Sequence, residues 1–299
     1  MNIRHAGITL IALAFLMAGT AAAELTPEAG AKITGLQKSL DSRGARWTAG
    51  ETEVSNLTED QWSTLTGLDI NAPSGPLAPE PPETRLLASL DWRDNGGNFV
   101  TAPKRQGSCG SCWSFAMTGA LESYVMRKRG EPGMGIDLSE QVYISCSSVG
   151  SCKGGVLFPL FLVRQGLPAE SAYPYAEADG SCSNAASGWE RGAHKIGGWG
   201  MVLPTVKKIK AALAHYGPLP TSMMVYEDFL HYKKGIYSRV SGKPLGAHAV
   251  LLVGYNDAGE YFIVKNSWGT GWGEDGFFRI DYSEMSSRVI FGLTTVAYY

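Results

Sequence analysis

A glycine- and cysteine-rich stretch, Gln106 to Trp113, leads directly into a long, largely apolar segment and most constrains how this chain can fold. It reads Gln-Gly-Ser-Cys-Gly-Ser-Cys-Trp, and the run Ser-Phe-Ala-Met-Thr-Gly-Ala-Leu that follows predicts a buried helix. The helix would begin at Cys112, with Ser111 available as its N-cap residue. Because a helix N-terminus carries about half a positive charge, it stabilises a thiolate, the nucleophilic form of cysteine. The stretch therefore predicts a reactive cysteine at the start of a buried helix.

Two further motifs lie far downstream: Gly-Ala-His-Ala-Val around His248 and Lys-Asn-Ser-Trp-Gly around Asn266. Together with the Cys109–Trp113 motif they resemble, in the same order, the motifs of the papain-like cysteine peptidases, such as papain and the cathepsins. The resemblance covers about residues 88 to 299. It implies an α+β, papain-like two-lobe fold, with a helical N-terminal lobe, a β-barrel-like C-terminal lobe and the active site in the cleft between them.

The pattern of apolar residues along the chain favours the same arrangement. In the first half, Leu138 to Gln141 begins a short helix that ends near Cys146, and an amphipathic helix follows Pro204. In the second half, runs rich in β-branched and aromatic residues predict strands. These runs span residues 249–255, 261–264, 276–280 and 289–297.

The resemblance also implies a role for each residue of the active site. Cys112 would be the nucleophile, and His248 would take its proton to form a thiolate–imidazolium pair, which lowers the pKa of the thiol. Asn266 would bind the second nitrogen of the His248 ring and fix its orientation. Gln106 would donate its side-chain amide to the developing oxyanion, together with the backbone N–H of Cys112. Trp268 would shield the His248–Asn266 hydrogen bond from water.

Substrate-binding residues follow from the same resemblance. Gly154 and Gly155 would leave a bare backbone edge on which a peptide adds as a strand. Beside this edge would lie an apolar pocket for the second residue before the scissile bond, lined by Val156, Leu157, Phe158 and Ala247. No insertion resembles the loop that makes cathepsin B a carboxydipeptidase. We therefore expect an endopeptidase that acts on protein or peptide substrates.

The chain has five cysteines, an odd number that in an exported protein suggests two disulfides and one free thiol. The resemblance pairs Cys109 with Cys152 and Cys146 with Cys182, which leaves Cys112 free. Taken alone, the Cys-x-x-Cys spacing also fits a redox pair, or a zinc site with the later cysteines. A loop rather than a strand precedes the motif, however, and neither alternative explains the histidine and asparagine motifs. We therefore expect no metal and no cofactor.

Residues 1–23 have the composition of a signal peptide. Arg4 gives a positive start, an apolar run covers Ile8 to Ala18, and Ala21 to Ala23 fits a small-residue cleavage site. The apolar run is short for a helix that spans a bilayer, although an uncleaved anchor is the alternative. The sequence thus predicts an exported protein, secreted or periplasmic, with no membrane attachment once the signal is removed.

Residues 24–83 differ in character from the rest and resemble a short propeptide, which the peptidase domain follows at 84–299. Apolar residues between 31 and 40 have helical spacing, and Thr58 begins a capping box at the start of a second helix. A proline-rich linker of extended character ends the segment, and we expect the mature protein to begin near residues 80–88. The propeptide would act as the enzyme's own inhibitor; a folding aid or a spacer is the alternative.

Charge argues against one class of partner. The net charge is −2, and the longest basic run, Arg127 to Arg129, lies at the end of the predicted helix, where cations stabilise the helix dipole. We therefore expect no nucleic-acid partner, and we expect a monomer.

The alternative class of function is a non-catalytic relative that binds peptides in the same cleft. The complete set of Gln106, Cys112, His248 and Asn266 argues against that alternative.

Overall fold

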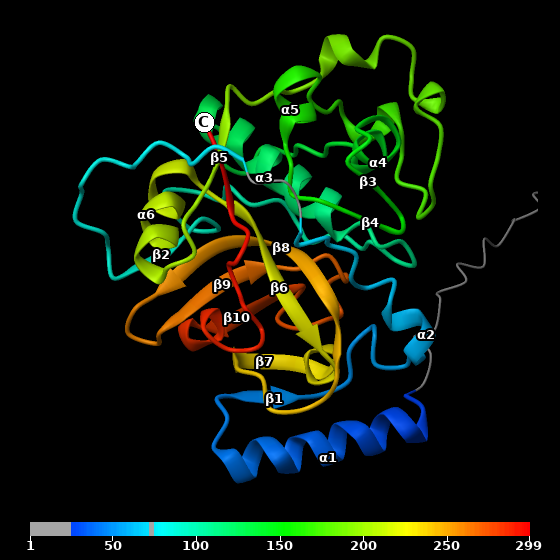
Figure 1. Ribbon diagram of the computed structural model, residues 1–299, viewed down its shortest axis with the longest axis vertical. Coiled ribbons are helices and arrows are strands. Elements are labelled where there is room, and N and C mark those ends of the chain that lie inside the picture. Colours follow the sequence, from blue (N-terminus) through cyan, green and yellow to red (C-terminus); the bar gives the residue numbers. More distant parts are fainter. Residues whose placement is uncertain (1–24, 72–74) are drawn as a thin grey trace, which may run out of the picture.

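The computed structural model describes residues 25–71 and 75–299, so the predicted signal peptide lies outside the described residues. Figure 1 shows two lobes, one in which helices gather and one formed mostly by a curved sheet. The fold is α+β with two lobes, as the resemblance implies. Within the described ranges no helix is both long and apolar enough to cross a membrane.

The first lobe contains three α-helices and a short hairpin: α3 (Cys112–Arg129), α4 (Glu140–Cys146), α5 (Leu160–Arg164), β3 (Gly150–Ser151) and β4 (Gly154–Gly155). Helix α3 begins at Cys112 as predicted and ends where Gly130 adopts the left-handed backbone that glycine takes at little cost, with φ 66°. Helix α4 begins after Ser139, whose hydroxyl accepts a hydrogen bond from the Val142 N–H at 3.0 Å. The end of α3 and the start of α4 are thus set by local sequence.

The second lobe is built on a seven-stranded sheet of order β1-β7-β10-β9-β8-β2, in which β6 also pairs with β8. The strands are β1 (Trp47–Ala49), β2 (Ser89–Asp91), β6 (Leu219–Tyr226), β7 (Tyr232–Tyr237), β8 (Pro244–Asn256), β9 (Tyr261–Lys265) and β10 (Phe277–Asp281). Strand β8 is the centre of this lobe, because it pairs antiparallel with β6, β9 and β2.

Shorter elements complete the fold. A second sheet pairs β5 (Trp199–Met201) with β11 (Val296–Tyr298), and α6 (Val206–Tyr216), the helix predicted after Pro204, packs against β11. One-turn 3₁₀ helices lie in the connections: η1 (Glu170–Ala172), η2 (Cys182–Asn184), η3 (Trp189–Gly192), η4 (Glu227–His231) and η5 (Tyr282–Met285).

The strand predicted at residues 289–297 is wrong over most of its length. Ile290 and Gly292 have left-handed backbone, with φ 44° and 80°, so the chain turns there instead of extending. Val289 and Phe291 are 0% and 1% exposed, so their apolar character reflects burial rather than a strand. Conversely, the structure has a strand, β6, that the sequence does not predict. It is buried on both faces, so its sequence lacks the alternation of polar and apolar residues that indicates a strand.

The N-terminal segment, residues 25–71, packs along the sheet lobe. Its helix α1 (Pro27–Arg43) is longer than the predicted 31–40 helix, because Thr26 caps its start and Gly44 ends it with left-handed backbone. Strand β1 pairs antiparallel with β7 and extends the sheet. In Figure 1, α1 and β1 lie at the outer edge of this lobe, and the chain returns through the single-turn helix α2 (Glu59–Trp62) toward the junction of the lobes.

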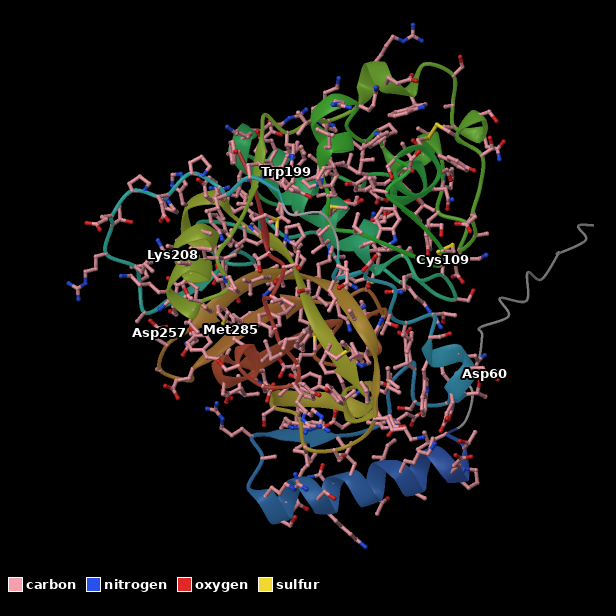
Figure 2. The ribbon with its side chains drawn as sticks, viewed as in Figure 1. Asp60, Cys109, Trp199, Lys208, Asp257 and Met285 are labelled. Carbon is pink, nitrogen blue, oxygen red and sulfur yellow. A yellow bond between two sulfur atoms is a disulfide. The ribbon has the colours of Figure 1, made fainter. Side chains whose placement is uncertain are left out.

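One continuous core joins the two lobes. Helix α3 lies against β8 and β6, and its Trp113 and Met117 side chains are fully buried. Figure 2 shows side chains filling the space between this helix and the sheet. An aromatic cluster continues the core inside the sheet lobe, where the Phe229 ring centroid lies 5.5 Å from that of Trp268 and 4.9 Å from that of Trp272. Because the interior is close-packed, the helix and the strands hold fixed positions relative to each other.

Candidate active site

Cys112 is the first residue of α3 and is the free cysteine of the described residues, with 0% of its surface exposed. The N–H of Ala249 on β8 donates to Cys112 Sγ at 3.4 Å, across the junction of the lobes. Ser111 occupies the N-cap position as predicted, but its side chain makes no capping hydrogen bond. Its hydroxyl lies 2.8 Å from the Tyr175 hydroxyl instead.

The structure brings His248 of β8 and Asn266, which follows β9, into direct contact. His248 Nε2 lies 2.8 Å from Asn266 Oδ1, and the backbone N–H of Ser267 donates to the same oxygen at 2.8 Å. Because an amide oxygen only accepts, Nε2 carries the ring proton. His248 Nδ1 has no hydrogen-bond partner among the described residues. In the neutral ring, Nδ1 is therefore the nitrogen that can take up a proton.

Trp268 covers this pair. Its ring centroid lies 4.9 Å from that of His248, and only 1% of its surface is exposed. The indole Nε1–H donates to the carbonyl oxygen of Leu65 in the N-terminal segment at 3.1 Å. The tryptophan is therefore packed against His248 and bonded to the segment that covers it.

Gln106 lies in the loop before α3 and is held at both ends of its amide. Ser267 Oγ donates to Gln106 Oε1 at 2.6 Å, which fixes the orientation of the amide. Gln106 Nε2 then donates to the carbonyl oxygens of Thr64 and Cys109, each at 3.0 Å. The sequence gives no sign of this role for Ser267 beyond its place in the Asn-Ser-Trp motif.

Burial favours the neutral form of both reactive groups in this covered site. Burial raises the pKa of the Cys112 thiol to about 12, although hydrogen bonds from the N–H groups of Ala249, Trp113 and Cys112 itself lower it. Burial lowers the pKa of His248 to about 4, although the hydrogen bond to Asn266 raises it. The expected thiolate–imidazolium pair is thus disfavoured while the cleft is covered, because low-dielectric surroundings penalise both charges.

Residues 64–69 of the N-terminal segment run through the junction of the lobes. The N–H groups of Gly67 and Leu68 both donate to the carbonyl oxygen of Ala247 at 3.1 Å. Gly155 donates to the Gly67 carbonyl at 2.8 Å and accepts from the Asp69 N–H at 2.8 Å. Leu68 and Gly155 form a parallel bridge. The segment therefore occupies the backbone groups that the resemblance assigns to a peptide substrate.

The other predicted substrate-binding residues lie on β4 and just after it. Gly154 has φ 128°, and a Cβ atom there would lie 2.8 Å from the Gly67 carbonyl oxygen, so this position requires glycine. Val156 and Phe158 are half-buried, and the Phe158 ring packs edge-on against Trp199 at 5.1 Å. Leu157 is 3% exposed and belongs to the hydrophobic core.

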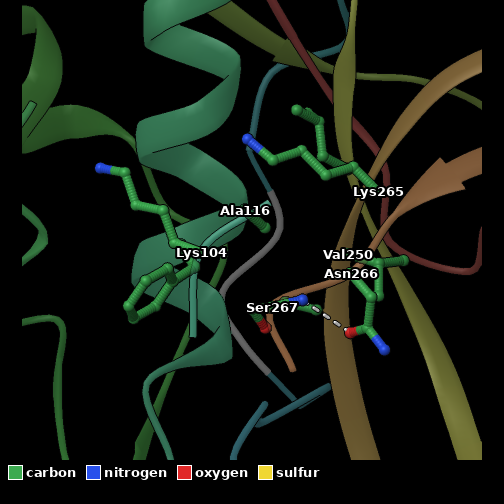
Figure 3. Close-up of a pocket in the computed structure, with 9 residues that line it drawn as sticks. Lys104, Ala116, Val250, Lys265, Asn266 and Ser267 are labelled. Atoms are coloured by element: carbon green, nitrogen blue, oxygen red, sulfur yellow. Dashed lines mark hydrogen bonds between the residues drawn. The ribbon is translucent and has the colours of Figure 1, made fainter. Parts of the chain in front are cut away.

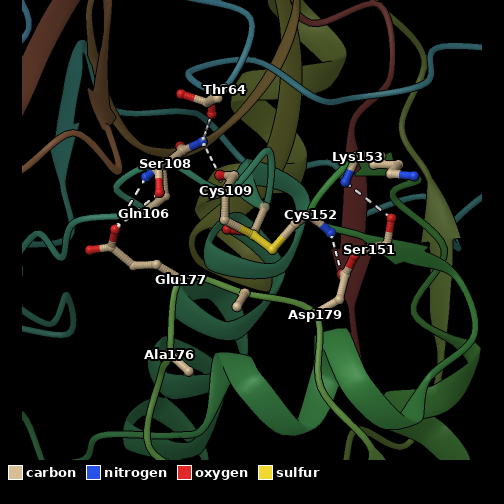
Figure 4. The surroundings of a disulfide bond; sticks show 12 residues. Thr64, Gln106, Ser108, Cys109, Ser151, Cys152, Lys153, Ala176, Glu177 and Asp179 are labelled. Carbon is tan, nitrogen blue, oxygen red and sulfur yellow. Dashed lines mark hydrogen bonds between the residues drawn. A yellow bond between two sulfur atoms is a disulfide. The ribbon is translucent and has the colours of Figure 1, made fainter. Parts of the chain in front are cut away.

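Two disulfides hold the loops of the helical lobe, Cys109–Cys152 and Cys146–Cys182. They are the pairs that the resemblance implies. Figure 4 shows the Cys109–Cys152 bond between two carboxylates, with Glu177 on the side of Gln106 and Ser108 and Asp179 on the side of Cys152. The first bond ties the loop before Cys112 to the hairpin that carries Gly154 and Gly155, so the nucleophile and the backbone edge are covalently linked.

A small cavity of about 20 Å³, room for about one water molecule, lies behind Asn266 and Ser267 (Figure 3). Lys104 and Lys265 reach its walls. Burial lowers the pKa of Lys104, but Glu140 and Glu122 outweigh burial, and the net shift is upward. Lys265 donates to Thr101 Oγ1 at 2.9 Å.

No group of His, Cys, Asp and Glu side chains in residues 25–71 and 75–299 is arranged to hold a metal ion.

A family model for papain family cysteine proteases matches residues 86–294. The chain belongs to this family. Among its papain-family relatives, pro-cathepsin H of Mus musculus is 39% identical over 208 residues, which are 65% of this chain and 60% of that protein. Ananain of Ananas comosus is 31% identical over 265 residues, which are 85% of this chain and 73% of that protein.

Solved structures of papain-family precursors have the same fold. The digestive procathepsin L2 proteinase from the Tenebrio molitor larval midgut superimposes with a TM-score of 0.78 at 29% identity, covering 90% of each chain. By sequence, the match spans only 60% of the length of mouse pro-cathepsin H and 59% of a cathepsin L-like proteinase of Fasciola hepatica. Because the structural match covers 90% of this chain, it includes much of the N-terminal segment, which lies outside the residues 86–294 matched by the family model.

Proposed function

We propose that this chain is the precursor of a cysteine endopeptidase that hydrolyses peptide bonds in protein or peptide substrates. The observation that carries the proposal is the placement of one free thiol and one oriented imidazole in the same buried site. Cys112 begins α3, while His248 is held through Nε2 by Asn266 and keeps Nδ1 free. A nucleophile, a base and a group that orients the base are the parts that covalent catalysis requires.

The reaction would proceed through a thioester. His248 Nδ1 takes the thiol proton of Cys112, and the thiolate attacks the carbonyl carbon of the scissile bond. The Cys112 N–H and Gln106 Nε2 donate to the oxyanion that forms. The imidazolium then gives its proton to the leaving amine as the C–N bond breaks, which leaves an acyl group on Sγ. Water, deprotonated by His248, attacks this thioester, releases the carboxylic acid and restores the thiol.

Substrate would bind along the edge formed by Gly154 and Gly155, with its second residue before the scissile bond in an apolar pocket that includes Val156 and Ala247. The N-terminal segment supports this assignment, because Leu68, an apolar residue, pairs with Gly155 and donates its N–H to Ala247. Backbone pairing of this kind gives affinity, and the pocket gives specificity.

The N-terminal segment would act as the inhibitor of its own enzyme. It holds Gln106 Nε2 through the Thr64 carbonyl and Trp268 Nε1 through the Leu65 carbonyl. It also runs parallel to Gly155. In this family such segments run through the cleft against the direction of a substrate, which avoids hydrolysis. Two contacts made by catalytic groups therefore favour an inhibitor over a mere folding aid or spacer.

The proline-rich linker gives the segment a second attachment. Two backbone hydrogen bonds, of 2.7 and 2.9 Å, join residues 76–78 to Met201 on β5, and the Tyr216 hydroxyl donates to the Pro79 carbonyl at 2.6 Å. Residues 82–85 beyond this attachment are exposed. A processing protease could reach the backbone there and separate residues 24–83 from the peptidase domain at 84–299.

We propose that the protein is exported, either secreted or periplasmic, through the signal peptide at residues 1–23. The two disulfides support an oxidising compartment.

The test of the function is turnover of a peptide substrate by the processed wild type and by Cys112→Ala. Loss of at least about 10³-fold in Cys112→Ala is expected, because removal of a nucleophile leaves only residual binding and oxyanion stabilisation. Peptide binding without turnover by the wild type would instead establish the non-catalytic alternative.

A further inference from the structure

A segment that the mechanism does not use, residues 175–179, lies against the loop that carries the nucleophile, residues 106–112. Successive residues of this segment contact, in turn, the nucleophile loop and helix α4. The side chains of Tyr175, Glu177 and Asp179 face the nucleophile loop or its disulfide partner, as Figure 4 shows for the two carboxylates. The backbone of the intervening residues bonds to Gln141 of α4: the Ala176 N–H at 3.0 Å and the Ala178 carbonyl at 2.9 Å.

Hydrogen bonds connect this segment to the loop and to the disulfide partner of the loop. The Tyr175 hydroxyl donates to the carbonyl oxygen of Gln106 at 2.6 Å. Glu177 Oε2 accepts from the Ser108 N–H at 3.3 Å, and Asp179 Oδ1 accepts at 2.7 Å from the N–H of Cys152, the disulfide partner of Cys109. The contacts are distributed along the whole loop, so the segment restrains it from its first residue to the disulfide.

Tyr175 also contacts the Ser111 hydroxyl, at the other end of the loop. Because the single Tyr175 proton is donated to Gln106, Ser111 is the donor across their 2.8 Å separation, and the Cys109 carbonyl oxygen, 3.3 Å away, is a second, longer acceptor for the same proton. An N-cap serine ordinarily accepts from the second or third N–H of its helix. Here it does not, because the Ser111 backbone, with φ −103° and ψ 16°, is not extended as an N-cap residue is. The Trp113 N–H bonds to Cys112 Sγ, where it favours the thiolate and opposes the effect of burial on the thiol pKa.

The Tyr175 ring is itself held in place. It packs edge-on against Phe115 of α3, with ring centroids 4.9 Å apart, and its backbone N–H donates to Glu170 Oε1 at 2.6 Å. Burial raises the pKa of its hydroxyl, against the hydrogen bond from Ser111, so the phenol stays protonated and remains a donor. A protonated, packed phenol can keep both contacts over the working pH range of a cysteine protease.

We propose that Tyr175 is a positioning residue of the protease reaction, which fixes the nucleophile loop at both ends, at the Gln106 carbonyl and at the Ser111 hydroxyl. The inference rests on the proposed function. Through Gln106 it acts on the donor to the oxyanion, and through Ser111 it acts on the residue that precedes Cys112. Hydrogen bonds in a chain polarise one another, so loss of the central hydroxyl affects both ends.

The test compares Tyr175→Phe with Tyr173→Phe. Each variant is produced as the full chain, cut by trypsin in the exposed linker at Arg85, and separated from the released segment. Tyr175→Phe keeps the ring and is expected to lower kcat about fivefold to tenfold while KM changes less than about twofold, because the lost contacts act in the transition state. Tyr173 lies on the same connection, and its hydroxyl contacts Asn184, so Tyr173→Phe should match the wild type.

A second readout does not depend on turnover. The rate of Cys112 alkylation by iodoacetamide is measured against pH, and the pH at which it rises should be higher in Tyr175→Phe. The loop before Cys112 then loses a restraint at both ends, and the N–H groups of the first helical turn stabilise the thiolate less well. In a Ser111→Ala background, the Tyr175→Phe change should shift this limb less than it does alone. Should Tyr175→Phe fail to fold, Ser111→Ala removes the same hydrogen bond from its other end and should shift this limb in the same direction. An unshifted limb in Ser111→Ala would overturn the proposed role of the contact.

The outcomes separate the two proposals. Absence of Cys112-dependent turnover in the wild type would overturn the proposed function, while the alkylation profile would still report on Tyr175. An unchanged kcat and an unchanged alkylation profile in Tyr175→Phe, with only a lower melting temperature, would overturn the positioning role and leave Tyr175 as a packing residue. Equal losses in Tyr173→Phe and Tyr175→Phe would overturn it as well.

Discussion

Gln106 Nε2 donates a hydrogen bond to the Thr64 carbonyl oxygen at 3.0 Å, so the proposed oxyanion donor is held by the chain's own N-terminal segment. A substrate oxyanion and the Thr64 carbonyl would compete for the same N–H. Together with the Trp268 contact to Leu65, this relationship makes inhibition by the segment directly testable.

Gly67→Ala should weaken inhibition by the isolated 24–83 peptide. A Cβ atom on Gly67 would lie 2.3 Å from the Gly110 carbonyl oxygen, and the φ of 145° further disfavours a side chain. Overpacking of this kind costs about 1–3 kcal/mol, so the inhibition constant should rise about fivefold to 150-fold. Inhibition of processed enzyme by the peptide measures it. Gly35→Ala on α1 is the matched control, because its Cβ atom meets nothing within 4 Å. Equal inhibition by the two variant peptides would contradict the docked geometry.

Inhibition by the same peptide should weaken as the pH falls from about 6.5 toward about 4. His231 Nδ1 lies 3.1 Å from Ser55 Oγ of the segment, and burial, with Lys32 second, lowers its pKa from 6.5 to about 4. The docked form therefore keeps His231 neutral where the undocked form takes up a proton, so acid favours release, by at most about tenfold per pH unit. Inhibition constants measured at several pH values should show this slope, and His231→Gln should flatten it. An unchanged slope in His231→Gln would assign the effect to another group.

Alkylation should modify Cys112 slowly in the full chain and quickly after processing. Burial raises the pKa of this thiol to about 12 while the segment covers it, and the thiolate is the reactive species. Rates of iodoacetamide labelling at neutral pH, before and after removal of the segment, measure the change. Peptide mapping should find the label on Cys112 alone, since the other four cysteines form disulfides. Label on Cys109 would contradict the pairing.

Processed enzyme should prefer aliphatic or aromatic residues two positions before the cleaved bond. The half-buried pocket residues Val156, Phe158 and Ala247 carry no charge that would recruit a basic side chain, and Leu157, predicted with them, lies in the core. A peptide library varied at this position and scored by kcat/KM measures the preference. Basic residues with the highest kcat/KM would show that an acidic group from elsewhere in the chain reaches the pocket.

Local sequence by itself determined the elements that carry the chemistry. The start of α4 follows from the cap at Ser139, and the helix from Cys112 follows from the apolar run that begins there; both act over a few residues. Strands β8 and β9 follow from apolar runs bounded by a turn, and they carry His248 and lead to Asn266. The resemblance of the three motifs then implied which of these residues meet.

Only the tertiary structure decided the contacts between segments distant in sequence. The entry of Thr64 to Asp69 into the cleft depends on backbone groups of Gly155 and Ala247, and a backbone group leaves no mark on residue identity. Ser111 suits a helix cap by local rules, yet its backbone is not extended and its hydroxyl lies 2.8 Å from that of Tyr175, 64 residues away. Burial likewise decided that the Cys112 thiol and the His248 ring are neutral in the covered cleft. Desolvation depends on everything packed around a group, whichever part of the chain supplies it.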